Sequence, residues 1–348
     1  MNEYIKKYIP EPVKRFKRNI CRRTDLITKW IKDLMACLYV WQGKLPPDSI
    51  DKQLDAKLYN DIPEKCEKTG VICILDGNMF HGGLTDRLRG ILSAYRESKR
   101  LDLPFYVMWD SPFDLTDFLV PASFDWRISH KEISRSRLNS KIVVADDLSD
   151  FQSLMRLRAA FHHPKPQIHL YTNADSARGE YASLYRELFK PSEKLQSEIN
   201  RHILFLSNEY IAFTFRFIGL LGDFTDWKEC LLTDQQQFYL MKKARDEFIK
   251  LTTNDYDGYK ILVTSDSKRF LEFIKDSDPR IYIIPGDIKH IDIDRNCGME
   301  VWTKTFIDQQ LLMGARKVIR MRTGEMYAAG FPRFAAEVGG VEFIDYKF

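Results

Sequence analysis

The sequence lacks the hydrophobic segments that would place it in or across a membrane. No apolar stretch follows the basic residues at its start, so we expect no signal peptide. No stretch approaches the roughly 20 apolar residues that a spanning helix needs. It also contains no Asn-x-Ser/Thr acceptor for glycosylation. Together these absences favour a chain that works in the cytoplasm.

The sequence is also poor in the patterns that bind metals or form disulfides. Its six cysteines have no CxxC or paired spacing, which indicates reduced thiols. No HExxH motif or carboxylate–histidine triad is present, and we expect no dedicated metal site. The segment Asp292-Ile293-Asp294 matches only the letters of a metal-binding DxD motif, and we expect it to lie in a surface turn.

What the chain does contain is typical of a globular protein. It has 348 residues, of which 44% are hydrophobic and 29% charged, enough for two domains and an appendage. The net charge of +4 is unevenly placed, because residues 1–23 hold eight Lys/Arg against two Glu. A nucleic-acid-binding protein more often spreads basic charge over its folded body, so we expect no nucleic-acid partner.

Residues 1–66 are predicted to form a basic leader, an amphipathic helix over 26–41 and a polar connector. Two interpretations of this extension stay open. Residues 1–45 would make a peripheral contact with an anionic membrane surface, with the helix lying in the interface. Alternatively, the helix is an ordinary amphipathic element packed on the first domain.

From residue 67 onward the sequence alternates between strand-like and helix-like segments. Strands are expected at Val71–Leu75, Phe105–Trp109, Lys141–Ala145, Ile211–Phe215, Tyr259–Thr264, Ile281–Pro285, Lys317–Met321 and Val341–Ile344. Helices are expected near 84–101, 234–252, 303–314 and 326–338, with further helices over 178–207 broken at Lys190-Pro191. This alternation predicts an α/β protein with two facing Rossmann-like domains, an N-terminal domain over 67–207 and a C-terminal domain over 208–348.

The most informative motif is His81-Gly82-Gly83-Leu84-Thr85-Asp86-Arg87, between the first strand and the first helix. A glycine turn at a helix start leaves backbone N–H groups for an anion, and arginine forks suit phosphate oxygens. We therefore predict that His81, Gly82, Gly83 and Arg87 bind substrate. The alternative is plain turn chemistry, because the glycines lack the spacing of a nucleotide fingerprint.

Three later strand ends carry polar residues of the same kind. Ligands in such sheets bind beyond the carboxyl ends of the strands. The candidates are Arg216, Asp223, Asp266, Ser267, Thr323 and Gly324. Each has a structural alternative: an ion pair from Arg216 to Asp223 or Asp226, and helix caps at Asp266 and Thr323.

These motifs together resemble those of fucosyltransferases of the two-Rossmann (GT-B) type, which include nodulation, core α-1,6 and protein O-fucosyltransferases. The loop from Gly82 to Leu88 resembles their Gly-Gly-x-x-Asn-Arg/Gln-Leu loop. Phe213-Thr214-Phe215-Arg216, followed by Gly222-Asp223, is similar to their His-x-Arg-(Arg)-(Gly)-Asp motif. Val263-Thr264-Ser265-Asp266-Ser267 resembles their nucleotide-contacting strand end, and Arg322-Thr323-Gly324 sits at their phosphate loop. The chain departs from the family pattern at Thr214, at Asp86 and in the insert Phe217–Leu221.

The resemblance implies an inverting, metal-independent glycosyltransferase that moves L-fucose from GDP-fucose to a glycan acceptor, without a cofactor. Arg216 would grip the donor pyrophosphate, and Asp223, or failing that Asp226, would act as general base. A polysaccharide-type, cytoplasmic enzyme acting on lipid-linked or soluble glycan intermediates is expected. The alternatives are a GT-B transferase with another nucleotide sugar, and a non-catalytic protein of the same fold that binds a nucleotide or glycan.

Overall fold

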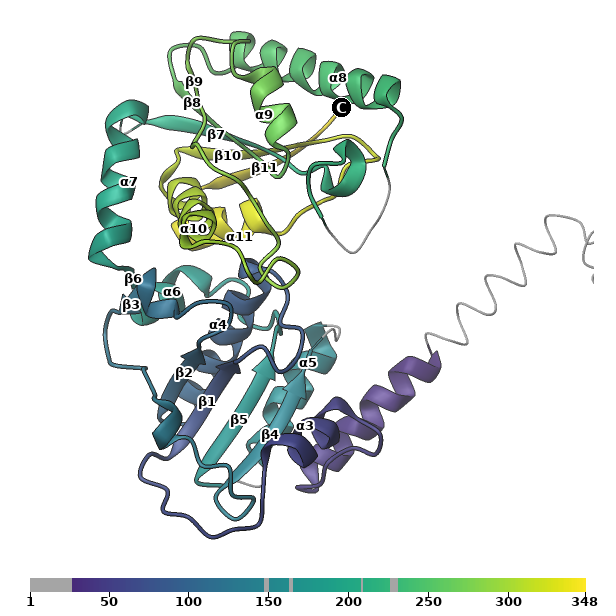
Figure 1. Ribbon diagram of the computed structural model, residues 1–348, viewed down its shortest axis with the longest axis vertical. Helices are drawn as coiled ribbons and strands as arrows, with labels where there is room; N and C mark the ends of the chain where they lie inside the picture. Colours follow the sequence, from purple (N-terminus) through teal and green to yellow (C-terminus); the bar gives the residue numbers. More distant parts are fainter. Residues whose placement is uncertain (1–26, 147–149, 163–164, 208, 226–230) are drawn as a thin grey trace, which may run out of the picture.

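The structure, a computed structural model, describes residues 27–146, 150–162, 165–207, 209–225 and 231–348. Within them it contains two parallel sheets, each covered by helices on both faces, and one small antiparallel pair of strands (Figure 1). The predicted α/β class with two Rossmann-like domains is therefore confirmed. A helix over residues 27–41 lies beside the first sheet, whereas most of the predicted basic leader falls outside the described residues.

The N-terminal domain is built on a four-stranded parallel sheet in the order β2-β1-β5-β4. Its strands are β1 (Gly70–Leu75), β2 (Phe105–Trp109), β4 (Ser140–Ala145) and β5 (Gln167–Thr172). The helices α4 (Leu84–Arg100) and α5 (Asp150–Ala160) pack on one face, and α3 (Ile50–Leu58) packs on the other. Because both faces are covered, β1 is buried along its whole length and reads as one apolar run.

The C-terminal domain has a five-stranded parallel sheet in the order β11-β10-β7-β8-β9. Its strands are β7 (Tyr210–Phe215), β8 (Lys260–Ser265), β9 (Ile281–Tyr282), β10 (Lys317–Arg322) and β11 (Glu342–Lys347). One face carries α8 (Asp234–Asn254) and α9 (Lys268–Ile274), and the other carries α10 (Met299–Gly314) and α11 (Phe331–Gly339). The last strand closes the sheet as predicted, running parallel to β10.

The two domains share one hydrophobic core. The helices α10 and α11 face the N-terminal domain, where α11 meets α4 and α6 (Tyr181–Leu188) (Figure 1). The rings of Phe118 and Phe306 stack with centroids 4.3 Å apart, and those of Tyr181 and Phe334 lie 5.0 Å apart. The chain crosses between the domains through β6 (Phe189–Pro191), which pairs with β3 (Leu119–Pro121), and through α7 (Glu193–Leu206).

One central strand was missing from the sequence prediction. β5 lies between β1 and β4, but its sequence alternates apolar residues with Gln167 and His169. Both polar side chains are fully buried and hydrogen-bonded: Gln167 Nε2 donates to the carbonyl oxygens of Lys68 and Glu132, and the ring of His169 bonds Tyr59. The predicted helices near 303 and 326 also have different starts, at Met299 and Phe331.

Candidate active site

The predicted polar residues of the C-terminal domain meet at one edge of its sheet. Arg216 follows β7, Asp266 follows β8 and Thr323 follows β10, and these three strands are neighbours in the sheet. The register places Phe215 beside both Ser265 and Met321, so the three strands end at the same level. Parallel topology thus brings together side chains that are about 50 residues apart or more.

Arg216 and Asp266 form a partly buried ion pair at this edge. Arg216 Nε lies 3.4 Å from Asp266 Oδ2, and the Arg216 side chain keeps 24% of its surface exposed. Its guanidinium also lies 4.3 Å from the ring centroid of Phe224. Asp266 accepts backbone hydrogen bonds from Phe217 (2.8 Å) and Ile218 (2.7 Å). Burial raises the pKa of the Asp266 carboxyl, and the charge of Arg216 opposes that shift.

Asp266 therefore organises the loop that follows β7 and does not cap the next helix. The cap of α9 is Ser267, whose Oγ accepts from Phe270 N at 3.0 Å, so a cap at Asp266 is not what the structure contains. Ile218 has a left-handed backbone with φ 56°, a strained conformation for a β-branched residue. The two backbone bonds to the buried carboxylate fix that turn and, with it, the position of Arg216.

Asp223 lies at the N-terminus of α9. Its Oδ2 accepts from Ser267 Oγ at 2.9 Å and from Arg269 N at 2.8 Å. Asp223 is an exposed residue, and a carboxylate at this position complements the helix dipole. Asp226, the second candidate base, lies outside the described residues.

Thr323 and Gly324 line a cavity of about 690 Å³ beside the first turns of α8. Thr323 Oγ1 accepts from Glu325 N at 3.2 Å in a turn, but the N-cap of the next helix, α11, is Gly330, so Thr323 does not cap a helix. A side chain at Gly324 would meet no atom within 4 Å, so the backbone here is open to a ligand. Basic and aromatic residues complete the wall: Phe238, Tyr239, Lys242, Lys243 and Phe348.

The loop before α4 has a different environment, because Arg87 is completely buried. Its guanidinium donates to the carbonyl oxygens of Gly82 (3.1 Å) and Ser111 (2.6 Å) and to Asp292 Oδ1 (2.7 Å). It also lies 5.0 Å from the ring centroid of Trp109. In this conformation Arg87 has no exposed surface with which to reach a phosphate. Its predicted contact with substrate stays a prediction.

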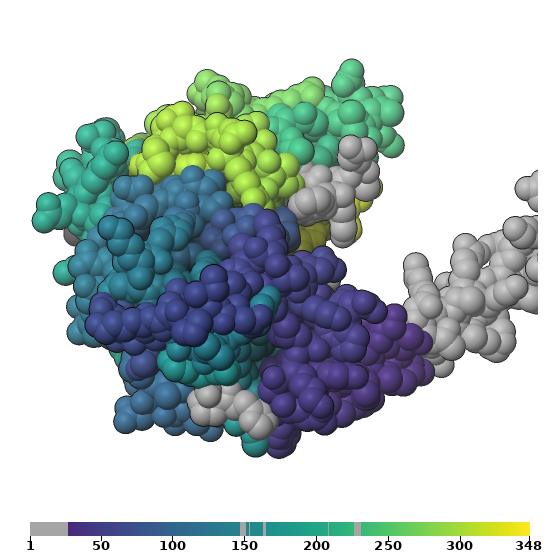
Figure 2. All heavy atoms as spheres, turned by 60° about the horizontal axis from the view of Figure 1, so that its bottom comes forward, coloured from purple at the N-terminus to yellow at the C-terminus, as the bar shows by residue number. Residues whose placement is uncertain are grey.

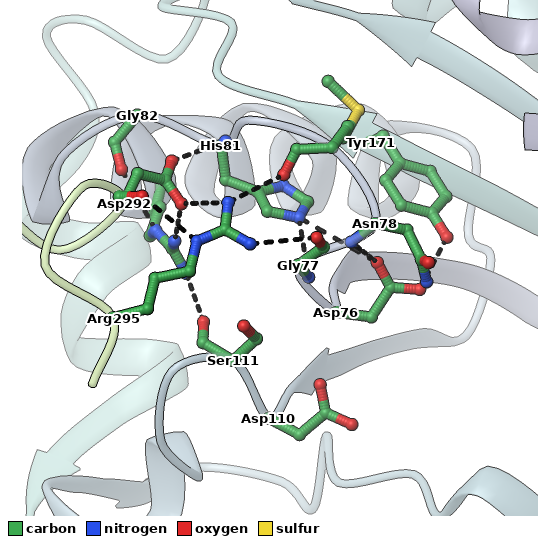
Figure 3. A network of polar contacts seen from close by, with 12 residues as sticks. Asp76, Gly77, Asn78, His81, Gly82, Asp110, Ser111, Tyr171, Asp292 and Arg295 are labelled. Atoms are coloured by element: carbon green, nitrogen blue, oxygen red, sulfur yellow. Dashed lines mark hydrogen bonds and ion pairs between the residues drawn. The ribbon is translucent and has the colours of Figure 1, made fainter.

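Asp292 supplies the anion that this loop was expected to attract (Figure 3). It comes from the C-terminal domain, and its Oδ2 accepts from His81 N at 2.6 Å while Oδ1 pairs with Arg87. Arg295 completes the network, donating to Asp292 Oδ1 at 3.1 Å and to the carbonyl oxygens of Gly77 and Met79. The expectation of a surface turn at Asp292 is therefore wrong, since its side chain is fully buried between the domains.

His81 is a neutral, buried member of the same network. Desolvation, aided by the charge of Arg87, lowers the pKa of His81 to about 4. Its Nε2 accepts a hydrogen bond from Gly77 N at 3.2 Å, and its ring stacks on Tyr171 with centroids 5.9 Å apart. The ring is thus uncharged at neutral pH and shielded from solvent. Gly82 has φ 82° and Gly83 N donates to Asp86, the ordinary geometry of a capped helix start.

Comparison with solved structures shows which proteins have this architecture. NodZ α-1,6-fucosyltransferase of Bradyrhizobium, soaked with GDP-fucose, matches with a TM-score of 0.53 at 15% identity, over 78% of this chain and 93% of that chain. A mutant of Arabidopsis thaliana FUT1 in complex with GDP matches with 0.53 at 14% identity, over 92% and 78%. This chain has the GT-B fold of fucosyltransferases. No family profile and no curated protein sequence matches it.

A third structure of this fold, POFUT1 in complex with GDP-fucose, matches with a TM-score of 0.50 at 11% identity, over 82% of this chain and 99% of that chain. The fold predicted from the motifs is thereby confirmed. At identities this low the likeness concerns the fold, so roles of individual residues rest on the geometry of this chain. Within the described residues no group of three or more His, Cys, Asp or Glu is arranged to hold a metal ion.

Sequence reasoning missed a second polar cluster, at the carboxyl edge of the N-terminal sheet. Asp76 directly follows β1 and accepts from Tyr171 Oη at 2.8 Å, with Arg135 at 3.8 Å. Asp110 directly follows β2 and pairs with the exposed His130 at 2.6 Å. The signal was available, because both aspartates come immediately after predicted strands. Their partners come from other segments and carry no local signal.

Proposed function

We propose that the protein is a glycosyltransferase that transfers L-fucose from GDP-fucose to a glycan acceptor with inversion at the anomeric carbon. The observation that carries the proposal is the placement of Arg216 beside Asp266, at the carboxyl edge of a GT-B C-terminal sheet. The fold is that of structures solved with GDP and GDP-fucose, which supports a nucleotide-sugar donor.

In this proposal the acceptor hydroxyl attacks the anomeric carbon as the bond to the pyrophosphate breaks. Negative charge then grows on the leaving diphosphate, and preorganised cations and N–H groups stabilise it. Arg216 supplies the cation, and Asp266 holds its guanidinium in place through the ion pair. The turn at Thr323-Gly324 supplies backbone donors. Ser267, also predicted to bind substrate, is fully buried and donates to Asp223, so it acts through that carboxylate. This charge stabilisation requires neither metal nor cofactor.

Asp223 is our first candidate for the general base. Its carboxylate is exposed, as a base that meets an acceptor must be, and it lies close to the Arg216–Asp266 pair through Ser267. The hydrogen bonds from Ser267 and Arg269 fix its orientation. In the N-terminal domain, His81, Gly82, Gly83 and Arg87 would then act on substrate indirectly, by holding the domains together at the loop before α4.

The proposal is tested with the full chain and a panel of nucleotides and nucleotide sugars. We expect GDP and GDP-fucose to raise the melting temperature and UDP to leave it unchanged, with and without a chelator. Transfer of radiolabelled fucose to a panel of glycans should fall about 100-fold in Arg216→Ala and be retained in Arg316→Ala. Arg316 is a matched control because it precedes β10, at the opposite edge of the sheet. Absence of binding for every guanine nucleotide would refute a fucosyl donor.

Two alternatives give different results in the same panel. A GT-B transferase with another donor would be stabilised by UDP or ADP rather than GDP. A non-catalytic binding protein would bind the nucleotide without turning over any donor; Thr214, in place of the family's histidine, favours this alternative. Its hydroxyl is buried without a hydrogen-bond partner among the described residues, so it offers the donor no exposed group. For the enzyme we also propose a cytoplasmic role in polysaccharide synthesis.

A further inference from the structure

The helix over residues 27–41 exposes a broad apolar face. Seven large hydrophobic side chains on it are between 39% and 57% exposed: Ile27, Trp30, Ile31, Leu34, Met35, Leu38 and Trp41. At about 100° per residue they span a continuous arc of about 140° around the helix. Isolated exposed hydrophobic residues are ordinary, but a contiguous face of this kind marks a binding surface. We call these seven residues the outer face.

The opposite side of the helix fixes it to the N-terminal domain. Cys37 and Val40 are buried, and Val40 belongs to the core that also contains Leu157 of α5. Asp33 accepts from Gln152 Nε2 at 3.2 Å. Figures 1 and 2 show the helix, in purple, at the margin of the domain, beside α3 and α5. The helix is therefore fixed with its outer face directed away from the N-terminal domain. The structure shows the packed helix of the second interpretation, and the contact with a membrane stays a prediction.

The sequence around the outer face is rich in basic residues. Residues 1–23 carry eight Lys/Arg against two Glu, and they directly precede the helix in the sequence. Lys29 and Lys32 lie on the helix outside the apolar arc. Trp30 lies near the start of the outer face and Trp41 at its end, about three turns apart. Tryptophan prefers the boundary between lipid and water, and clustered basic residues are attracted to anionic headgroups. No helix among the described residues is long and apolar enough to cross a membrane.

We propose that the outer face binds the surface of an anionic lipid bilayer, with the helix lying in the plane of the interface. The apolar side chains would enter the region between headgroups and acyl chains, while the basic residues pair with lipid phosphates. A second copy of the chain is a poorer occupant. Pairing two outer faces would bring two segments of about +6 together without neutralising either, whereas anionic lipid neutralises both.

The test is flotation of the full chain with vesicles of two compositions. One set is phosphatidylcholine alone, and the other contains about one third phosphatidylglycerol, so that only the surface charge differs. We expect binding to the anionic vesicles, weakening at least about tenfold between about 0.05 and 0.5 M salt because exposed charges are screened. Binding that is equal for both compositions, or no binding at all, would overturn the proposal.

Two variants distinguish binding through the outer face from non-specific binding to vesicles. Leu34→Glu and Leu38→Glu should each lower the partition coefficient at least about tenfold, because a carboxylate replaces a lipid-facing side chain. Leu204→Glu is the matched control, since Leu204 is 84% exposed on α7, a different helix, and should change nothing. Melting temperatures of all variants should equal that of the wild type. Unchanged binding in both outer-face variants would refute the assignment.

Light scattering of the free protein tests whether a second copy of the chain covers the outer face. We expect a monomer whose mass does not change in Leu34→Glu. A dimer that this substitution dissociates would identify a second copy as the occupant and would overturn the bilayer proposal. None of these measurements uses sugar transfer, so their outcome is independent of the proposed enzyme activity.

Discussion

Replacing Asp292 with alanine should destabilise the protein more than any other single loop substitution that leaves the strand ends untouched. Asp292 accepts from His81 N, Arg87 Nη2 and Arg295 Nη2, and neither Asp292 nor Arg87 has exposed side-chain surface. The alanine variant leaves a fully buried guanidinium without its counter-charge. Removing one partner of a buried ion pair costs about 3–5 kcal/mol, and we expect a loss of this size in the free energy of unfolding.

The magnitude is measured by urea denaturation with linear extrapolation. Asp294→Ala is the matched control in the same loop. Its carboxylate accepts one backbone bond from His290 at 3.3 Å, so its loss should cost about 1 kcal/mol. Combining Asp292→Ala with Arg87→Met removes the orphaned charge as well. The double variant should therefore be less destabilised than the sum of the single variants, by about 2 kcal/mol.

Two outcomes would refute this reasoning. If Asp292→Ala lies within about 1 kcal/mol of the wild type, the pair is not the isolated buried charge that the geometry describes. If the double variant costs the full sum of the single variants, Arg87 and Asp292 are not energetically coupled. Asp292→Asn should fall between the wild type and the alanine variant, because it keeps one acceptor oxygen and loses the charge.

Three further predictions concern the proposed active site and the buried histidine. Arg216→Ala should lower kcat/KM for sugar transfer about 100-fold, corresponding to about 3 kcal/mol of transition-state stabilisation. Arg216→Lys should recover only part of that activity. A near wild-type rate in the alanine variant would place the site elsewhere. Asp223→Asn should abolish turnover with an unchanged melting temperature, since the amide oxygen can still accept from Arg269 N. Asp223→Ala should also cost about 1 kcal/mol of the free energy of unfolding. Full activity in Asp223→Asn would exclude this residue as the base. Folded His81 has a pKa of about 4 against 6.5 for the ordinary group, so below pH 6.5 the unfolded state takes up the proton first. The neutral histidine contributes about 3 kcal/mol to the free energy of unfolding above pH 6.5, and this contribution is lost as the pH falls toward 4. The free energy of unfolding of His81→Gln should therefore depend less steeply on pH. A profile identical to that of the wild type would contradict the assignment.

Much of the architecture could be predicted because its signals are local. β1 is an unbroken apolar run and β7 is nearly so, and such runs identify strands that are covered on both faces. The start of α8 is marked in the sequence by Thr233 and Gln236, which form a capping box. Parallel topology then implied that Arg216, Asp266 and Thr323 would lie at a common edge, which the strand order of the C-terminal sheet bears out.

The remainder depended on contacts between distant parts of the chain. Arg87 and Asp292 are 205 residues apart, and no local pattern distinguishes a carboxylate that seals a domain interface from one in an exposed turn. β5 was not recognised as a central strand because it contains polar residues. Their hydrogen-bond partners Tyr59, Lys68 and Glu132 come from other segments. The sequence predicted a substrate phosphate at the glycine loop, and it does not reveal that a carboxylate of the same chain, Asp292, lies against this loop.

The hydrophobic core that runs through both domains has a consequence for engineering. Because α10 and α11 pack into the core of the N-terminal domain as well as that of their own, dividing the chain into two halves would expose apolar residues on both. A chimera that exchanges the C-terminal half with a related protein would have to transplant the facing residues of α4 and α6 as well, together with Phe118 and Tyr181, the aromatic partners of Phe306 and Phe334. Under the proposed function, changes of donor are more safely made within the loops after β7, β8 and β10, where the scaffold beneath stays intact.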